Sequence, residues 1–263
     1  MFSTTYTKSF YDETLLTSMR SAAVIVPLVL KLTGAHSVVD LGCGTGSWLA
    51  AFSANGADDI CGIDNNSLAN ADMQVSRLNI MKHDLTQNFQ LDRTFDLATC
   101  LEVAEHLPLS NAAQIVANLT RLAPMILFSA AIPHQGGTNH INEQWPEFWA
   151  HLFAEHDYVP VDCLREALWD DDNVAYWYAQ NLILYVKRSV LADSPELAQL
   201  AAATNPRRLT LVHPKTYVKN HKLTHDPKTL FMRLVWNLLP RTIRRALIKP
   251  LATVFWKQVN TRY

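Results

Sequence analysis

Cysteine is scarce in this chain, and its few cysteines are not grouped. There are 4 among 263 residues, and no two of them form a Cys-x-x-Cys pair. Their positions are far apart, in predicted strands or in a glycine-rich turn: Cys43, Cys61, Cys100 and Cys163. This spacing argues against a disulfide framework, and we expect reduced, mostly buried thiols in a cytosolic protein.

Long apolar runs are also lacking. No uninterrupted apolar stretch reaches the roughly 18 residues that a membrane-spanning helix needs. The N-terminal sequence MFSTTYTKSFYDET has no charged segment followed by an apolar one, so no signal peptide is expected. Apolar residues still make up 49% of the chain, an ordinary share for a globular protein, and the length allows one α/β domain with an appendage.

Acidic residues are nearly absent from the last part of the chain. Residues 1–206 carry 10 Lys and Arg against 23 Asp and Glu, whereas residues 207–263 carry 13 Lys and Arg and one acid, Asp226. The net charge of −1 therefore combines −13 in the first part with +12 in the second. We predict two parts with different tasks, a domain over 1–206 and a basic tail over 207–263.

The clearest motif is a glycine-rich turn between a short apolar run and an amphipathic segment. Residues 37–46 read SVVDLGCGTG, in which the apolar residues predict a buried strand, and residues 48–52 continue at helical spacing. Gly42, Gly44 and Gly46 let a ligand approach the backbone, and the start of the next helix offers free N–H groups. A strand, turn and helix of this kind predict a nucleotide-binding site.

Two acidic residues accompany the turn. Asp40 precedes the first glycine, and Asp64 ends the next predicted strand, over 60–63. A carboxylate at the second position can accept hydrogen bonds from two ribose hydroxyls. A dinucleotide-binding fold is the alternative, but its pattern is Gly-x-Gly-x-x-Gly, whereas position 47 here is Ser and the third glycine is Gly46.

The stretches VVDLGCGTG and GIDNN together resemble the first two motifs of class I S-adenosylmethionine-dependent methyltransferases. The resemblance implies an α/β fold, a doubly wound Rossmann-like seven-stranded sheet with an antiparallel seventh strand, here with a helical C-terminal appendage. An acid at position 40 suits a sulfonium cofactor with a free amino group better than a pyrophosphate, so a nicotinamide enzyme is the less favoured reading. The residues expected to contact S-adenosylmethionine are Asp40, Gly42, Gly44, Gly46, Asp64, Asn65, Asp84, Leu85 and Leu101.

Apolar periodicity predicts the remaining elements. Helices are expected over 14–33, 110–122 and 142–156, and strands over 38–41, 60–63, 75–80, 95–100, 125–130, 158–164 and 180–186. Asp84 follows the third strand, where the resemblance implies contact with the adenine amine; the alternative is a loop aspartate that caps a turn. Ligands of open α/β sheets lie beyond the carboxyl ends of the strands near the switch point, so residues 100–106 are expected beside the transferred methyl group.

Candidate catalytic residues stand in the loops that follow the fourth and fifth strands. Methyl transfer to a hydroxyl requires alignment of the acceptor and a group that takes up its proton. His106, Glu102 and His134 are the candidates for this work. The structural alternative is that Glu102 contacts the cofactor and His106 packs near it.

A metal site is a second interpretation of the same stretch. Glu102, Glu105 and His106 stand at positions i, i+3 and i+4, which share one face of a helical turn, and His134 or His140 would add a ligand. The E-x-x-E-H pattern resembles ubiquinone-biosynthesis O-methyltransferases and small-RNA 2′-O-methyltransferases, in which a matching motif helps to hold Mg²⁺. Mg²⁺ would lower the pKa of the attacking hydroxyl; a metal-free histidine base is the alternative.

These features predict O-methylation of a small-molecule, glycan or lipid-linked acceptor. The stretch HINEQWPEFW resembles bacterial methyltransferases of surface-glycan and secondary-metabolite pathways. The alternative is a non-catalytic binding module with the cofactor fold, tethered to a membrane or a partner. Intact glycines and the presence of Asp64 argue against that alternative.

The basic tail contains two apolar stripes separated by Pro240. A basic amphipathic helix can lie in an anionic membrane surface, which would place a cytoplasmic protein peripherally at the inner face of a membrane. Packing on its own acidic domain or on a second subunit is the alternative. Nucleic acid is the least expected partner, because the stripes are too apolar for an arm that follows phosphates. Nothing in the sequence specifies an oligomeric state.

Overall fold

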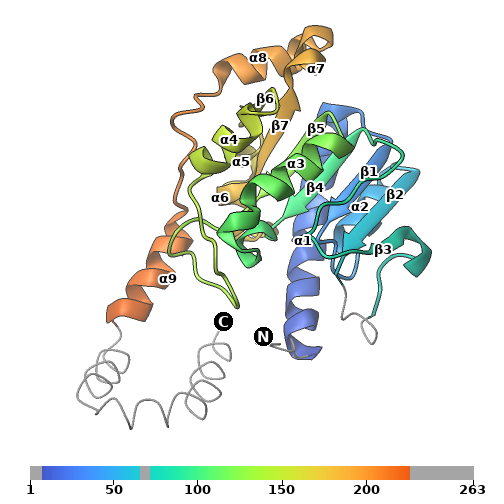
Figure 1. Ribbon diagram of the computed structural model, residues 1–263. Helices are drawn as coiled ribbons and strands as arrows, with labels where there is room; N and C mark the ends of the chain where they lie inside the picture. Colours follow the sequence, from blue (N-terminus) through green and yellow to red (C-terminus); the bar gives the residue numbers. More distant parts are fainter. Residues whose placement is uncertain (1–7, 66–71, 226–263) are drawn as a thin grey trace. The chain divides into compact units, whose positions relative to one another are not determined.

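The computed structural model describes residues 8–65 and 72–225 (Figure 1). The chain divides into two compact units, Met1–Thr216 and Tyr217–Tyr263. Both apolar stripes predicted in the basic tail lie outside the described residues.

Within the described residues, the first unit is built on a seven-stranded sheet in the order β3-β2-β1-β4-β5-β7-β6 (Figure 1). The strands are β1 Ser37–Leu41, β2 Asp59–Asp64, β3 Ile80–Lys82, β4 Leu97–Leu101, β5 Met125–Ser129, β6 Tyr158–Val161 and β7 Ile183–Lys187. β7 runs antiparallel to both β5 and β6, and the other neighbouring pairs are parallel. The predicted doubly wound sheet with an antiparallel seventh strand is confirmed, and its switch point lies between β1 and β4.

Helices cover both faces of the sheet (Figure 1). The α-helices of the described residues are α1 Lys8–Thr33, α2 Ser47–Ala54, α3 Ala112–Leu122, α4 Pro146–Ala154, α5 Arg165–Leu168, α6 Tyr176–Asn181, α7 Arg188–Asp193, α8 Pro195–Ala203 and α9 Pro214–His225. Most of α9 belongs to the second unit. Successive side chains of a strand point to opposite faces, so Val38 belongs to the core under α1 and α2, and Val39 to the core under α3 and α4.

α1 shows that composition alone does not identify a membrane span. Its segment Leu15–Thr33 is long and apolar enough to cross a membrane. The sequence predicts no apolar run of that length, whereas Leu15–Thr33 reaches it by mean hydropathy although it contains Arg20 and Lys31. One side of the helix is fully buried in the core, at Ala22, Ile25, Val26 and Val29. A core helix of a globular domain meets the same criteria of length and hydropathy.

Three predicted elements begin three to five residues later than expected. Instead of a strand over 75–80, the Ser76 hydroxyl accepts a hydrogen bond from the backbone N–H of Leu78 and starts a 3₁₀ turn, and β3 begins at Ile80. β7 begins after α6, which occupies the start of the predicted strand. α4 begins at Pro146, a residue that suits the first helical position because it lacks an N–H.

The first unit extends past the predicted boundary at 206. Leu209, His213 and Thr216 are 1%, 5% and 2% exposed, and the unit ends at Thr216. The change of charge therefore does not coincide with the end of the first unit, and the segment 207–216 contributes three buried side chains to it.

Candidate active site

The glycine-rich turn follows β1, and all three of its glycines have a positive φ of 80°, 51° and 85°. A Cβ atom at Gly42 would lie 2.4 Å from Cγ2 of Val103, and one at Gly46 would lie 2.5 Å from Cγ2 of Val75. At Gly44 no atom of the described residues lies within 4 Å of that point. Packing of the turn thus requires two of the glycines, and the third leaves open space in which a ligand can approach the backbone.

Asp64 lies beside this turn. β1 and β2 are paired in register from Ser37↔Asp59 to Leu41↔Ile63, so the end of β2 reaches the start of the turn. Oδ2 of Asp64 accepts a hydrogen bond of 2.9 Å from the backbone N–H of Gly44. Asn65 follows and is exposed. The structure therefore brings the predicted ribose acceptor to the glycine turn.

Asp40 is a buried acid in β1, 2% exposed. Its Oδ1 accepts a hydrogen bond of 2.6 Å from the Thr99 hydroxyl of β4. Burial raises the pKa of Asp40 to about 7, with the Thr99 hydrogen bond opposing this shift and the charge of Asp64 adding to it. A cationic amino group beside Asp40 would favour its ionised form, as the predicted cofactor contact requires.

The other predicted cofactor residues lie after β3, where Asp84 and Leu85 are expected to contact adenine, and at the end of β4, where Leu101 is expected to contact the cofactor. Oδ1 of Asp84 accepts hydrogen bonds from the backbone N–H and the hydroxyl of Thr86, at 2.9 and 2.7 Å. These bonds lower the pKa of Asp84 and cap a turn, the alternative that the sequence left open. Leu85 and Leu101 are buried in the two cores. Contact of Asp84 and Leu85 with adenine, and of Leu101 with the cofactor, stays a prediction.

Glu102 does not share a helical face with Glu105 and His106. It follows β4 in a left-handed conformation with φ of 55°, and a 3₁₀ turn over Ala104–His106 comes next. The expected α-helical turn is absent from this described stretch. The backbone N–H of Glu102 donates to both O and Oγ of Ser129, which holds the residue at the end of β5.

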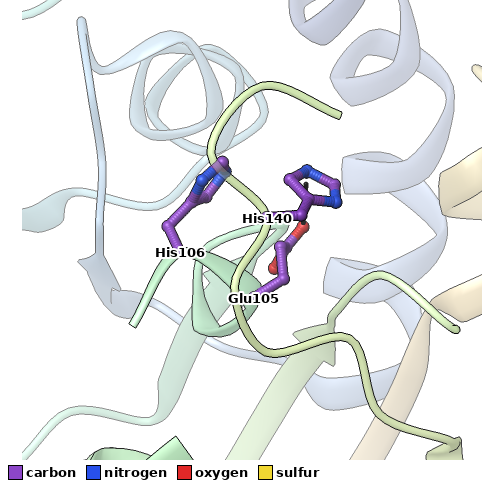
Figure 2. A group of neighbouring side chains, drawn as sticks. All are labelled: Glu105, His106 and His140. Carbon is purple, nitrogen blue, oxygen red and sulfur yellow. Dashed lines mark ion pairs between the residues drawn. The ribbon is translucent and has the colours of Figure 1, made fainter. Parts of the chain in front are cut away.

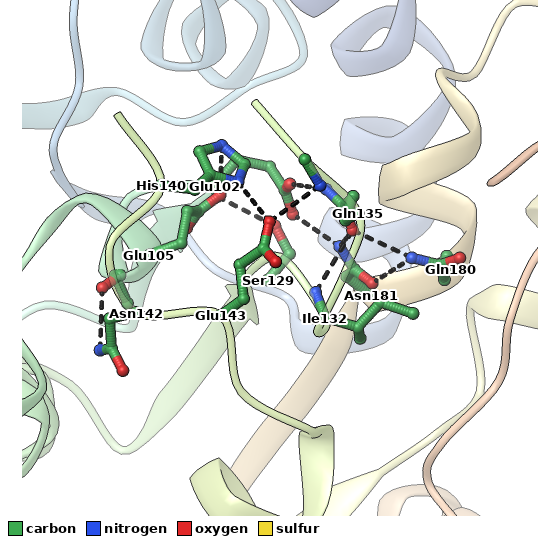
Figure 3. Close-up of polar contacts among 12 residues, drawn as sticks. Glu102, Glu105, Ser129, Ile132, Gln135, His140, Asn142, Glu143, Gln180 and Asn181 are labelled. Atoms are coloured by element: carbon green, nitrogen blue, oxygen red, sulfur yellow. Dashed lines mark hydrogen bonds and ion pairs between the residues drawn. The ribbon is translucent and has the colours of Figure 1, made fainter. Parts of the chain in front are cut away.

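The Glu102 carboxylate faces a network of buried amides (Figure 3). Its Oε2 accepts from Nε2 of Gln135 at 2.9 Å, and its Oε1 accepts from Nδ2 of Asn181 at 3.1 Å. Burial raises the pKa of Glu102, and these two hydrogen bonds oppose the shift. Gln180 extends the network. Sequence reasoning missed these amides, because they are uncharged, belong to no motif and come from segments far apart in the chain.

Glu105, His106 and His140 form a group whose ligand atoms all lie within 4.8 Å of one another (Figure 2). Glu105 is fully buried, and among the described residues neither its carboxyl oxygens nor Nδ1 of His106 make a hydrogen bond of ordinary geometry. Three of the four predicted metal ligands thus meet here, and Glu102 and His134 are outside the group. His134 is exposed, and its catalytic role stays a prediction.

Burial shifts the pKa values of Glu105 and His106. Burial and the charge of Glu102 raise the pKa of Glu105 well above its usual range. Burial and the neighbouring His140 lower the pKa of His106 to about 4, so its imidazole is neutral at pH 7. The two imidazole rings are 4.9 Å apart and meet edge to face.

A loop built around Glu143 orients His140. Nδ1 of His140 lies 3.0 Å from Oε1 of Glu143, and Nε2 lies 4.0 Å from Oε1 of Glu105. The Glu143 carboxylate also accepts hydrogen bonds from the backbone N–H groups of His134 and Gly136, each at 2.8 Å. A Cβ atom at Gly137 would lie 2.1 Å from Nε2 of His140. The sequence analysis missed Glu143, although its position three residues after His140 was the available signal.

Comparison with known proteins decides between the two cofactor classes that a glycine turn allows. A family model described as a methyltransferase domain matches residues 14–165. No curated protein matches the chain.

Solved structures match at low identity. The sugar N-methyltransferase KedS8 from Streptoalloteichus sp. has a TM-score of 0.55 at 16% identity, with 72% of this chain and 95% of that chain covered. The amino pentose methyltransferase CalS10 from Micromonospora echinaspora has a TM-score of 0.49 at 16% identity, with 71% and 100% covered. Magnesium protoporphyrin IX methyltransferase from Synechocystis has a TM-score of 0.46 at 17% identity, with 70% and 90% covered.

At such identities a structural match shows the fold, whereas the family model covers more than half of the chain and shows the family. The chain belongs to the class I methyltransferases, enzymes that take their methyl group from S-adenosylmethionine.

Proposed function

We propose that this enzyme methylates a hydroxyl oxygen of a small-molecule, glycan or lipid-linked acceptor. The observation that carries the proposal is the group formed by Glu105, His106 and His140, just beyond the carboxyl end of β4. Ligands of open α/β sheets lie at this edge, near the switch point between β1 and β4. A hydroxyl acceptor needs a nearby group that takes up its proton, and an amine needs one less.

His106 is the proposed proton acceptor. Its imidazole is neutral at pH 7, because its pKa is about 4. A base of such low pKa contributes modestly, so alignment of the acceptor with the sulfonium carbon supplies most of the rate. Glu102 is held at the end of β4 by the amide network, and we propose that it orients the cofactor or the acceptor.

The same group fits a divalent cation. One carboxylate and two imidazoles converge, and a cation would give partners to the oxygens of Glu105 and to Nδ1 of His106. The contact between Glu143 and Nδ1 of His140 matches the way in which carboxylates orient metal-binding imidazoles. A bound cation would lower the pKa of the acceptor hydroxyl.

The identity of the cation is open to direct test. Mg²⁺, the cation that the sequence resemblance implies, prefers oxygen ligands and keeps several waters, whereas imidazole suits Zn²⁺. Calorimetric titration with Mg²⁺, Mn²⁺ and Zn²⁺ should show binding that His140→Ala abolishes. Equal heats from the wild type and the variant would reject the cation, and His106 would then act as a base without metal.

The acceptor class is tested by supplying purified enzyme and S-adenosylmethionine with a labelled methyl group to cell extract divided into lipid, glycan, small-molecule and RNA fractions. Label should enter one of the first three. His106→Ala should lower that transfer about 100-fold and leave S-adenosylmethionine affinity unchanged. Label confined to RNA would contradict the proposal.

We also propose that the basic tail attaches this cytoplasmic enzyme to the inner face of a membrane. The support is the +12 charge of residues 207–263 and their two apolar stripes. Such attachment would place the active site near a lipid-linked or membrane-proximal acceptor.

A further inference from the structure

Gln180 is a fully buried side chain whose amide bonds to two different parts of the first unit. Its Nε2 donates to Oε1 of Gln135 at 3.0 Å and to Oδ1 of Asn181 at 2.9 Å (Figure 3). Its Oε1 accepts from the backbone N–H of His213 at 2.9 Å and from the hydroxyl of Thr216 at 2.8 Å. Both N–H groups and both lone pairs of the amide are used, so its orientation is fixed from two sides.

One side leads directly to Glu102. Gln135 and Asn181, which receive the hydrogen bonds of Gln180, each donate to one oxygen of the Glu102 carboxylate. Asn181 also donates to Oε1 of Gln135 at 2.8 Å, which closes the network. A continuous chain of hydrogen bonds therefore runs from Thr216 to the carboxylate at the end of β4.

The other side is the segment 209–216, which docks through buried groups. Arg165 is 1% exposed, and its Nη1 donates to the carbonyl oxygens of both Leu209 and Gln180, at 2.7 and 2.9 Å. Oε1 of Glu147 accepts from the backbone N–H groups of Leu209 and Thr210, each at 2.8 Å. Several independent contacts thus hold this segment in one position.

We propose that Gln180 is a positioning residue that makes the placement of Glu102 depend on the docking of residues 209–216. Glu102 needs such support, because a non-glycine residue with φ of 55° keeps this conformation only where its surroundings over-determine it. Loss of the Thr216 hydroxyl leaves the Gln180 oxygen with one donor, and the loosened amide no longer fixes Gln135 and Asn181. The inference rests on the methyltransferase family and is independent of the acceptor class.

The test compares variants of the full-length protein in which side-chain hydroxyls of the segment 209–216 are removed or kept. Thr216→Val removes the hydroxyl that reaches Gln180 and keeps the shape of the side chain, and Thr216→Ser keeps the hydroxyl. Thr210→Val is the matched control, because the Thr210 hydroxyl bonds to Glu147 outside the network, and the backbone N–H groups of Leu209 and Thr210 still bond to Glu147 and keep the segment docked. Gln180→Met is the stronger variant, and Thr216→Val keeps the test valid if Gln180→Met fails to fold.

Calorimetry with S-adenosylmethionine and hydrogen exchange of the peptide 99–107 supply the readouts. Thr216→Val should raise the dissociation constant about 3- to 10-fold and accelerate exchange around Glu102, Thr216→Ser should restore both, and Thr210→Val should change neither. Wild-type affinity and exchange in Thr216→Val, or the same change in Thr210→Val, would overturn the inference. Failure of the wild type to bind S-adenosylmethionine would instead count against the cofactor site.

Discussion

The carboxyl groups of this site differ in their burial and in their hydrogen-bond donors, and these differences indicate which ligand group each one suits. Asp40 and Glu105 are buried, and burial raises the pKa of each. Asp64 instead accepts from a backbone N–H of the glycine turn. The buried acids suit cationic partners, a cofactor amino group or a metal ion, whereas the acid at the turn suits hydroxyl donors.

Asp64→Ala should weaken S-adenosylmethionine binding by about 1–3 kcal/mol, because the ribose hydroxyls lose their acceptor. Isothermal calorimetry measures the change. Asp59→Ala, at the opposite end of β2, is the control, since Asp59 pairs with Arg93 on the surface. Unchanged affinity in Asp64→Ala would reject the ribose assignment.

Glu143→Gln should lower methyl transfer about 10-fold or more. A carboxylate only accepts hydrogen bonds, so its contact with Nδ1 of His140 places a proton on that nitrogen and turns Nε2 toward Glu105. The comparison is Glu155→Gln, which removes the charge beside exposed His151. Rates measured at saturating S-adenosylmethionine should fall only for Glu143→Gln, and equal rates would show that His140 needs no such partner.

Helices and strands with continuous or regularly spaced apolar residues were predicted close to their observed positions. Elements whose first residue depends on a local capping hydrogen bond were not. β1, β5 and the helix α3 lie close to their expected positions, because continuous or periodic apolar residues define them. β3 was misplaced because the Ser76 hydroxyl starts a turn, a local contact that competes with extended backbone.

The cofactor residues could be predicted because a turn with acids at fixed offsets is contiguous in sequence. The amides around Glu102 could not, because Gln135, Gln180 and Asn181 meet only after the sheet brings β4, β5 and β7 together. The left-handed backbone of Glu102 likewise has no signature in the sequence. Because of this conformation, Glu102 does not join Glu105 and His106 on one face, as the predicted metal site required.

The segment 207–216 changes what truncation should do. Removal of residues 207–263 takes away buried Leu209 and the hydrogen bonds that Arg165, Glu147 and Gln180 make with this segment. A protein that ends at 206 should therefore be less stable than one that ends at 216 by about 3 kcal/mol or more. Thermal unfolding of the two truncations measures this, and equal midpoints would show that the segment adds nothing to the fold.

The charge of the whole molecule is divided between an acidic first part and a basic last part. If the basic residues meet anionic lipid, each one near the surface contributes about 1 kcal/mol. Full-length protein should sediment with anionic vesicles at low salt, and removal of residues 217–263 should abolish this. High salt should release only part of the protein, because the apolar contribution is not screened. Protein that stays in the supernatant at low salt would favour packing of the tail on protein.

The bond formed in the product tests the central claim most directly. Enzyme, S-adenosylmethionine with an isotope-labelled methyl group and the accepting fraction are incubated, and the chemical shift of the labelled carbon is read by NMR. A methyl group attached to oxygen is the predicted result, since the site presents carboxylate and imidazole groups suited to a hydroxyl acceptor. A methyl group found only on nitrogen or carbon would contradict the account.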